Sequence, residues 1–138
     1  MAKNEEAVKK DLFGFGEKNV AFAKYFIGDS YLNGLVAPDD NIDVNVSNVN
    51  FEPGCRNDWH IHHDGFQILL VTAGEGWYQE EGKPAQLLKP GDVVAIHEGV
   101  KHWHGATKDS WFSHIAITKG TSEWLEKVDD VYYDQLEK

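Results

Sequence analysis

Residues 54–74 read GCRNDWHIHHDGFQILLVTAG and contain the pattern that decides the fold. His60 and His62 lie two positions apart within this stretch. Side chains on an extended strand alternate between its two faces, so both imidazoles are expected to point to the same side. Two imidazoles that converge in this way form part of a metal site. The remaining ligands, and the scaffold that holds them, are expected from the rest of the chain.

Strand-length segments separated by turns run through the middle of the chain. Residues 42–51, IDVNVSNVNF, alternate apolar and polar side chains, which is the pattern of a half-buried strand. The turn EPG, the apolar run QILLVTA, a hairpin within WYQEEGKPAQLLK, the strand DVVAI and the last strand WFSHIAIT follow in that order. Turn signals arrive about every ten residues, a spacing that is typical of an antiparallel sandwich or barrel.

The two ends of the chain have a different pattern. Residues 4–13, NEEAVKKDLF, are compatible with one or two helical turns, whereas residues 20–36 favour short strands broken by turns. In residues 121–138, Thr121 or Ser122 is expected to cap a helix whose apolar side includes Trp124. The sequence therefore predicts an all-β architecture, a small jelly roll, with short helical N- and C-terminal segments.

Composition limits the possible functions. The 138 residues fit a single domain, residues 1–138, and the 41% of hydrophobic residues can fill one core. A formal net charge of −10 argues against nucleic acid or an anionic membrane surface as a partner. No apolar run approaches the roughly 20 residues that span a bilayer, and the charged N-terminus lacks a signal-peptide pattern. A cytoplasmic protein is expected, and the single cysteine, Cys55, is compatible with a reducing compartment.

Two spaced groups of glycine and histidine carry the chemistry. In the first group, five residues separate a glycine from the first of two histidines; the group contains Gly54, His60, His62, Gln67 and Gly74. In the second group, five residues separate a glycine from a histidine; the group contains Gly91, His97, Gly99 and His102. Sixteen residues separate the groups, which is enough for one hairpin between neighbouring strands.

These two groups resemble the two motifs of the cupin superfamily, in the same order, over about residues 44–118. The resemblance implies a double-stranded β-helix, or jelly-roll barrel, with a core of about residues 42–118 and three histidines that point into its mouth. His60, His62 and His102 match the three histidine ligands of a metal ion. Gln67 stands where cupins usually carry a glutamate ligand, so the fourth ligand is expected to be a neutral amide.

Several longer stretches are similar to a smaller cupin group, namely FEPGCRNDWHIH, KPGDVVAI, EGVKHWHGA and FSHIAI. That group includes proteins associated with carboxymuconolactone decarboxylase and bacterial manganese-dependent hydroxynitrile lyases. The resemblance favours Mn²⁺ or Fe²⁺, although Ni²⁺, Co²⁺ and Zn²⁺ also suit imidazole and amide ligands. It also implies a homodimer, for which the aromatic segment 22–35 would suit the interface.

Neutral ligands leave a divalent ion a strong Lewis acid, suited to lyase, isomerase or decarboxylase chemistry on a small organic molecule. Because Gln67 cannot act as a base, proton transfer falls to a nearby imidazole or to metal-bound hydroxide, and His104 and His114 are the candidate catalytic residues. His63 and His97 are expected to face outward or lie in turns.

Two further readings stay open. An Fe²⁺-dependent dioxygenase is compatible with a three-histidine site, although the pattern of two histidines and one carboxylate is absent. A non-catalytic cupin that binds a ligand or a metal is the alternative from a different class.

Overall fold

The computed structural model describes residues 2–136. Two short helices, α1 (Glu5–Lys9) and α2 (Asp130–Asp134), lie near the two ends of the chain, and a single 3₁₀ turn covers Ala23–Tyr25. The remaining elements are strands: β1 (Glu17–Lys18), β2 (Phe26–Ile27), β3 (Ser30–Val36), β4 (Asn45–Phe51), β5 (Arg56–Asn57), β6 (His60–Gly74), β7 (Gly76–Glu80), β8 (Gln86–Leu88), β9 (Val93–Ile96), β10 (His102–Ala106) and β11 (Phe112–Trp124). The prediction of an all-β fold with short helical ends is confirmed.

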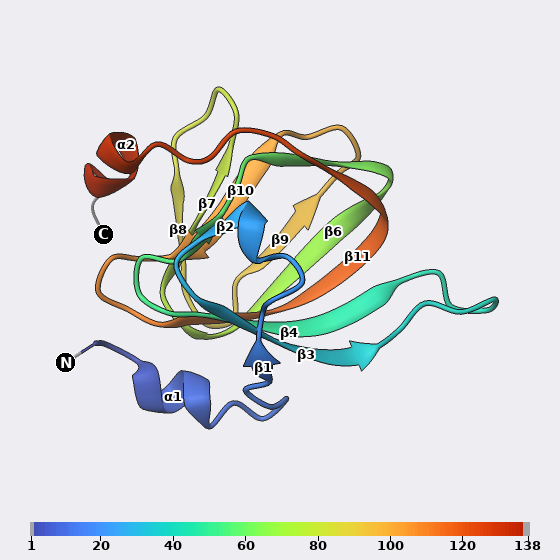
Figure 1. Ribbon diagram of the computed structural model, residues 1–138, viewed down its shortest axis with the longest axis horizontal. Coiled ribbons are helices and arrows are strands. Elements are labelled where there is room, and N and C mark those ends of the chain that lie inside the picture. Colours follow the sequence, from blue (N-terminus) through green and yellow to red (C-terminus); the bar gives the residue numbers. More distant parts are fainter. Residues whose placement is uncertain (1, 137–138) are drawn as a thin grey trace.

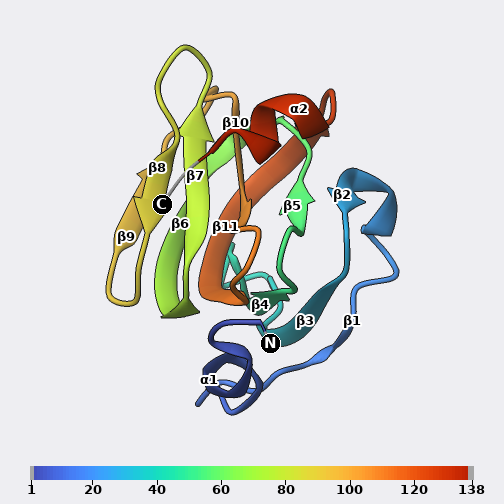
Figure 2. The same cartoon turned by 90° about the vertical axis from the view of Figure 1, so that its left-hand side faces the viewer.

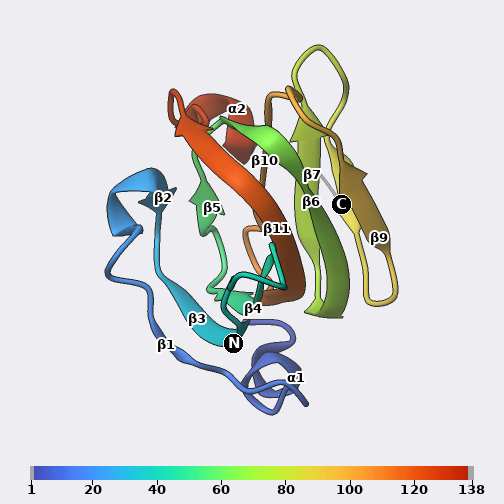
Figure 3. The same cartoon turned by 90° about the vertical axis from the view of Figure 1, so that its right-hand side faces the viewer.

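The strands pair in an antiparallel manner and curve into a barrel (Figure 1). Their order is β1-β3-β4-β11-β6-β10-β5-β2, with β9 beside β6 and β7 between β10 and β8. Figures 2 and 3 show β6 to β9 on one side of the molecule and β1 to β3 on the other. Strands β6 and β10 meet at His60 and His102, which are opposite each other in register. Two histidines from the two sequence motifs are therefore neighbours because of backbone pairing.

A bulge in β6 turns the Gln67 side chain to the face of the strand on which His62 lies. Strict alternation would place His62 and Gln67, five positions apart, on opposite faces of the strand. Asp64 has a φ of 59°, and the register of β6 against β11 shifts here by one residue. Gly65 makes this close approach possible, because a Cβ at this position would lie 2.0 Å from the Lys119 carbonyl oxygen. The extra residue turns Gln67 to the same side as His62.

The strand β4 is buried on both faces over its second half. Every second residue of β4 lines the interior of the barrel: Asn45, Ser47, Val49 and Phe51. On the outer face, the Asn48 amide donates to the Gly14 carbonyl at 2.7 Å, and the Asn50 amide donates to the Phe15 carbonyl at 2.6 Å. The segment after α1 therefore covers the outside of the sheet next to the cavity.

The prediction of a helix in the first part of residues 121–138 is wrong. Residues 121–124 belong to β11 and pair with residues 60–63 of β6, so the strand runs through the position where the helix was expected to begin. Pairing of these residues with β6 outweighs their local helical pattern. The helix of this tail, α2, begins after Asp129, whose carboxylate accepts a hydrogen bond from the backbone N–H of Tyr132 at 3.1 Å. No helix in residues 2–136 is long and apolar enough to cross a membrane.

Candidate metal centre

A cavity of about 620 Å³ lies inside the barrel. Aromatic and aliphatic side chains form much of its wall, including Phe22, Phe26, Leu32, Phe51 and Trp124. The polar part of the wall carries amides, hydroxyls and imidazoles: Asn19, Asn45, Ser47, Asn57, His60, His62, Gln67, His104, His114, Thr118, Thr121 and Ser122. None of the described lining residues is an aspartate or glutamate, so the chemistry of this wall depends on neutral groups.

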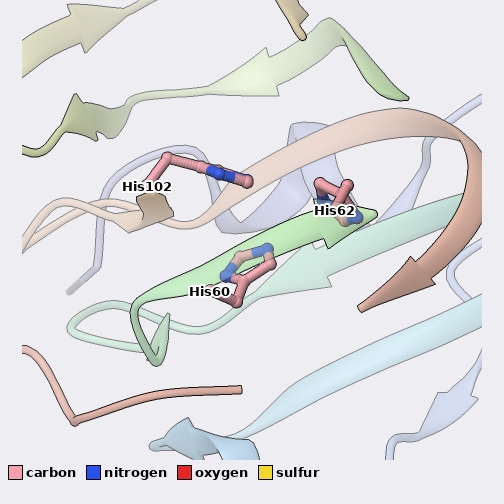
Figure 4. A group of neighbouring side chains, drawn as sticks. All are labelled: His60, His62 and His102. Carbon is pink, nitrogen blue, oxygen red and sulfur yellow. The ribbon is translucent and has the colours of Figure 1, made fainter. Parts of the chain in front are cut away.

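Three buried histidines converge on one point beside this cavity. His60 and His62 project from β6 and His102 from β10, and their rings face one another (Figure 4). One nitrogen from each ring lies within 4.8 Å of those of the other two. Three nitrogens bound about 2.1 Å from one ion lie about 3 to 3.6 Å apart, so these rings are close enough to share an ion after small movements of their side chains.

Backbone carbonyls orient two of these imidazoles. His60 Nδ1 lies 2.8 Å from the Asp58 carbonyl oxygen, and His102 Nδ1 lies 2.9 Å from the Val100 carbonyl oxygen. A carbonyl can only accept a hydrogen bond, so the proton of each neutral ring is on Nδ1 and a lone pair remains on Nε2. His102 Nε2 is buried without a hydrogen-bond partner, as expected for a nitrogen that is oriented to bind a metal ion.

Side-chain hydroxyls hold the third imidazole and the glutamine. His62 Nδ1 lies 3.2 Å from Ser122 Oγ, and the Gln67 amide nitrogen donates to Thr118 Oγ1 at 2.9 Å. The other ends of the two side chains meet, with His62 Nε2 3.2 Å from Gln67 Oε1. Two ligand atoms at right angles around an ion, each about 2.1 Å away, would be about 3 Å apart. This separation fits shared coordination by His62 and Gln67.

Burial keeps all three imidazoles neutral. Loss of solvent lowers the pKa of His60 well below its ordinary value, and the neighbouring His102 adds to this shift. Burial also lowers the pKa of His62, against a hydrogen bond to Gln67 that raises it, and lowers the pKa of His102 to about 4. A neutral ring offers the lone pair that a metal ion needs. The donor set, three neutral imidazoles beside an amide oxygen, therefore fits a divalent transition-metal ion.

The other two predicted site residues, His104 and His114, also line the cavity. His114 Nε2 lies 3.1 Å from His104 Nδ1, so the two rings are directly hydrogen-bonded. The Asn57 side chain accepts from the His104 backbone N–H at 2.9 Å and places its amide nitrogen 3.2 Å from His104 Nε2. Burial lowers the pKa of His104 well below its ordinary value and that of His114 to about 3. Both rings are neutral at physiological pH.

His63 and His97 are exposed and lie outside the cavity wall, as expected. His63 pairs with Glu123 at 2.6 Å on the surface. The local sequence did not predict the role of β11, whose residues Thr118 and Ser122 contact the candidate ligands. Nor did it predict the contact of Trp124, whose ring stacks on His60 with a centroid distance of 4.5 Å. The alternation of WFSHIAIT predicted β11 only as far as Thr118. Residues 119–124 of this strand were therefore not expected to contribute to the site.

A jelly-roll barrel with a cluster of three buried histidines in its wall defines a class of small metal-binding β proteins. The chain belongs to the cupin domain family, whose model matches residues 47–118. The predicted family is thereby confirmed.

Two relatives are similar over most of the chain. An (R)-mandelonitrile lyase from Granulicella tundricola is 41% identical over 115 residues, which cover 80% of this chain and 87% of that protein. A crystal structure of a cupin-like protein from Thermotoga maritima is 43% identical, with a TM-score of 0.83, and the match covers 91% of this chain and 96% of that one. A shorter match, 26% identical over 68 residues, covers 46% of this chain and 40% of an acireductone dioxygenase from Bacillus cytotoxicus.

Proposed function

We propose that this protein is a metal-dependent lyase that cleaves, or in reverse forms, the carbon–carbon bond of a small α-hydroxynitrile. The observation that carries the proposal is the cluster of His60, His62 and His102 beside a cavity whose described lining residues include no aspartate or glutamate. The similarity to an (R)-mandelonitrile lyase supports the class of substrate, since mandelonitrile is an aryl hydroxynitrile.

In this proposal, His60, His62, His102 and Gln67 hold one divalent ion, with Mn²⁺ or Fe²⁺ preferred. Such an ion would supply Lewis acidity, which favours the loss of a proton from a bound hydroxyl and stabilises negative charge. The ligands add no charge of their own, because the amide of Gln67 replaces a carboxylate. The ion's full double charge would therefore be available to the substrate.

The reaction requires one proton to be removed and one to be delivered. The substrate hydroxyl loses its proton as the bond to the nitrile carbon breaks, which yields an aldehyde and cyanide, and cyanide then takes up a proton. We assign both transfers to the His104 and His114 pair, because no described carboxylate lines the cavity. His114 Nδ1 is buried without a hydrogen-bond partner, so it can accept a proton in the tautomer in which His114 Nε2 carries the hydrogen and donates to His104 Nδ1.

The low pKa values of this pair are compatible with such a role. Both rings are neutral before the reaction and can accept a proton. Protonation inside the barrel is unfavourable in isolation, but the cyanide anion forms in the same cavity and its charge attracts the imidazolium. The apolar side chains of the wall, among them Phe26 and Phe51, would contact the substituent of the aldehyde.

The test is the cleavage of (R)-mandelonitrile by the metal-loaded protein, followed by the absorbance of benzaldehyde. The proposal predicts turnover above the uncatalysed rate, loss of turnover after chelation, and faster cleavage of one enantiomer. The His114→Ala variant should retain its metal and lose about 10²- to 10⁴-fold in kcat, the range for a lost acid–base group. Cleavage no faster than the background rate by a fully metal-loaded protein would contradict the proposal.

A second candidate is an Fe²⁺-dependent dioxygenase, supported by the shorter similarity to an acireductone dioxygenase. Three imidazoles can hold Fe²⁺ as readily as Mn²⁺. The two functions differ in their need for oxygen. Activity that disappears under anaerobic conditions and returns with air would favour the dioxygenase, whereas unchanged cleavage without oxygen would favour the lyase.

A further inference from the structure

Two hydroxyl side chains of β11 lie opposite the two candidate ligands that no backbone carbonyl anchors. In the antiparallel pairing of β6 and β11, Thr118 is the register partner of Gln67, and Ser122 is the register partner of His62. The two contacts follow this register, at 2.9 Å for Thr118 and 3.2 Å for Ser122. The bulge at Asp64 and the shift near Gly120 keep both pairs aligned.

The Gln67 amide has two chemically different ends that have nearly the same shape. Its oxygen carries lone pairs for a cation, whereas its nitrogen carries only donors and cannot bind one. The terminal torsion of glutamine has broad, roughly two-fold preferences, so the side chain itself does not choose which end faces the site. A hydrogen-bond partner outside the metal site can stabilise the orientation in which the amide oxygen faces the site.

Thr118 is such a group. Its Oγ1 accepts a hydrogen bond from the Gln67 amide nitrogen, while Gln67 Oε1 faces His62 Nε2 on the other side at 3.2 Å. Threonine is branched at Cβ and its χ1 is restricted, so its hydroxyl has few alternative positions. Gln67 is 8% exposed, and an amide group without an acceptor would be costly there.

We propose that Thr118 is a positioning residue for the metal site, because its hydroxyl accepts from the Gln67 amide nitrogen and holds this side chain with the amide oxygen toward the site. The inference rests on the metal site proposed above, but not on the reaction. It concerns a side chain of β11 that is not itself one of the proposed ligands. Its effect on metal binding is expected to pass entirely through Gln67.

The experiment measures the affinity of the full-length protein for Mn²⁺ by competition with a chelator. Thr118→Val keeps the shape of the side chain and removes the acceptor, and it should weaken Mn²⁺ binding by about 10-fold or more. Thr118→Ser restores the hydroxyl and should restore most of the affinity. Thr72→Val is the matched control, because it is the same substitution on the paired strand β6 at a residue outside the cavity lining, where the Thr72 hydroxyl donates to Asp11; its Mn²⁺ affinity should equal that of the wild type.

A double-mutant cycle separates positioning from a general structural effect. In the Gln67→Ala background, Thr118→Val should cause no further loss of Mn²⁺ affinity. Wild-type affinity in Thr118→Val, or an equal loss with and without Gln67, would overturn the inference. A wild-type protein that binds no Mn²⁺ would overturn the inference together with the metal site, whereas normal Mn²⁺ binding without cleavage of mandelonitrile would contradict only the proposed reaction.

Discussion

The two halves of the candidate metal site are held in different ways. His60 and His102 are anchored by backbone carbonyls two residues before them, whereas His62 and Gln67 are anchored by hydroxyls from the neighbouring strand. A carbonyl accepts only, so it fixes both the ring and its tautomer. A hydroxyl can donate or accept, so it fixes the ring and leaves the position of the proton free.

The two halves therefore differ in how they are prepared to bind an ion. The carbonyl-anchored half has its lone pairs directed at the site in advance, as the buried and unpartnered Nε2 of His102 shows. In the hydroxyl-anchored half, the two ligand atoms can form a hydrogen bond with each other when no ion is bound, because His62 Nε2 and Gln67 Oε1 are within hydrogen-bonding distance. A binding ion would replace that contact. The hydroxyls could then reorient, because each can either donate or accept a hydrogen bond.

The largest effect is expected from removing a ligand of the carbonyl-anchored half. His102→Ala should abolish metal binding. Removing a residue that only hydrogen-bonds to a ligand lowers metal affinity by up to about 100-fold, and the loss of the ligand itself should exceed that. His63→Ala is the matched control, since His63 is exposed and lies outside the site. Elemental analysis of both variants checks the prediction, and a metal content in His102→Ala equal to that of the control would contradict it.

The charge of the hydroxyl-anchored half is tested by Gln67→Glu. A carboxylate adds a negative charge to a site of neutral donors, so the affinity for Mn²⁺ should rise while Lewis acidity and turnover fall, the turnover by about 10-fold or more. Mn²⁺ titrations and kcat measured at saturating metal separate the two effects. Equal turnover of the two forms would show that the neutrality of the fourth ligand is unimportant.

A smaller effect is expected from the anchor of His62. Ser122→Ala removes the hydroxyl and should weaken metal binding by about 10-fold, the lower end of the range for such partners. No side-chain substitution can remove the matching anchors of His60 and His102, since these are carbonyls. If Ser122→Ala binds metal like the wild type, the hydroxyl is not an anchor and the comparison between the two halves fails.

The pH dependence of the metal-free protein tests the carbonyl-anchored half without any ion. Unfolded His102 takes up a proton near its ordinary pKa of 6.5, but folded His102 does so only near a pKa of about 4. The unfolded state thus binds more protons in this window. The free energy of unfolding should fall as the pH falls from 6.5 to 4, by up to about 1.4 kcal/mol per pH unit for each such group. Urea unfolding of chelator-treated wild type and His102→Ala should show a shallower decline in the variant; parallel declines would contradict the assignment.

Local pattern predicted the strands in the middle of the chain and the shared face of His60 and His62. The two-residue spacing of His60 and His62 is enough to place them on one face, and the glycine spacings bring in His102 through the resemblance to cupins. Gln67 shows the limit of pattern. Alternation alone points it away from His62, and only the bulge at Asp64, created by the close approach of β6 and β11, turns it back.

The contribution of β11 could not be predicted because a local signal competed with a long-range one. Thr121 and Ser122 are good helix caps, and Trp124 fits an apolar helical stripe. In the structure the same residues pair with β6, and Trp124 stacks on His60. Pairing between strands separated by some sixty residues leaves no mark in the local sequence, so the anchors Ser122 and Thr118 were found only in the fold.

The central claim is that His60, His62 and His102 form a site for one divalent metal ion. The most direct test is elemental analysis of the purified wild type after loading with Mn²⁺ or Fe²⁺ and removal of free metal, beside His60→Ala treated in the same way. The account predicts one ion per chain in the wild type and close to none in the variant. A wild-type protein that remains free of metal after loading, or a variant that retains a full ion, would contradict it.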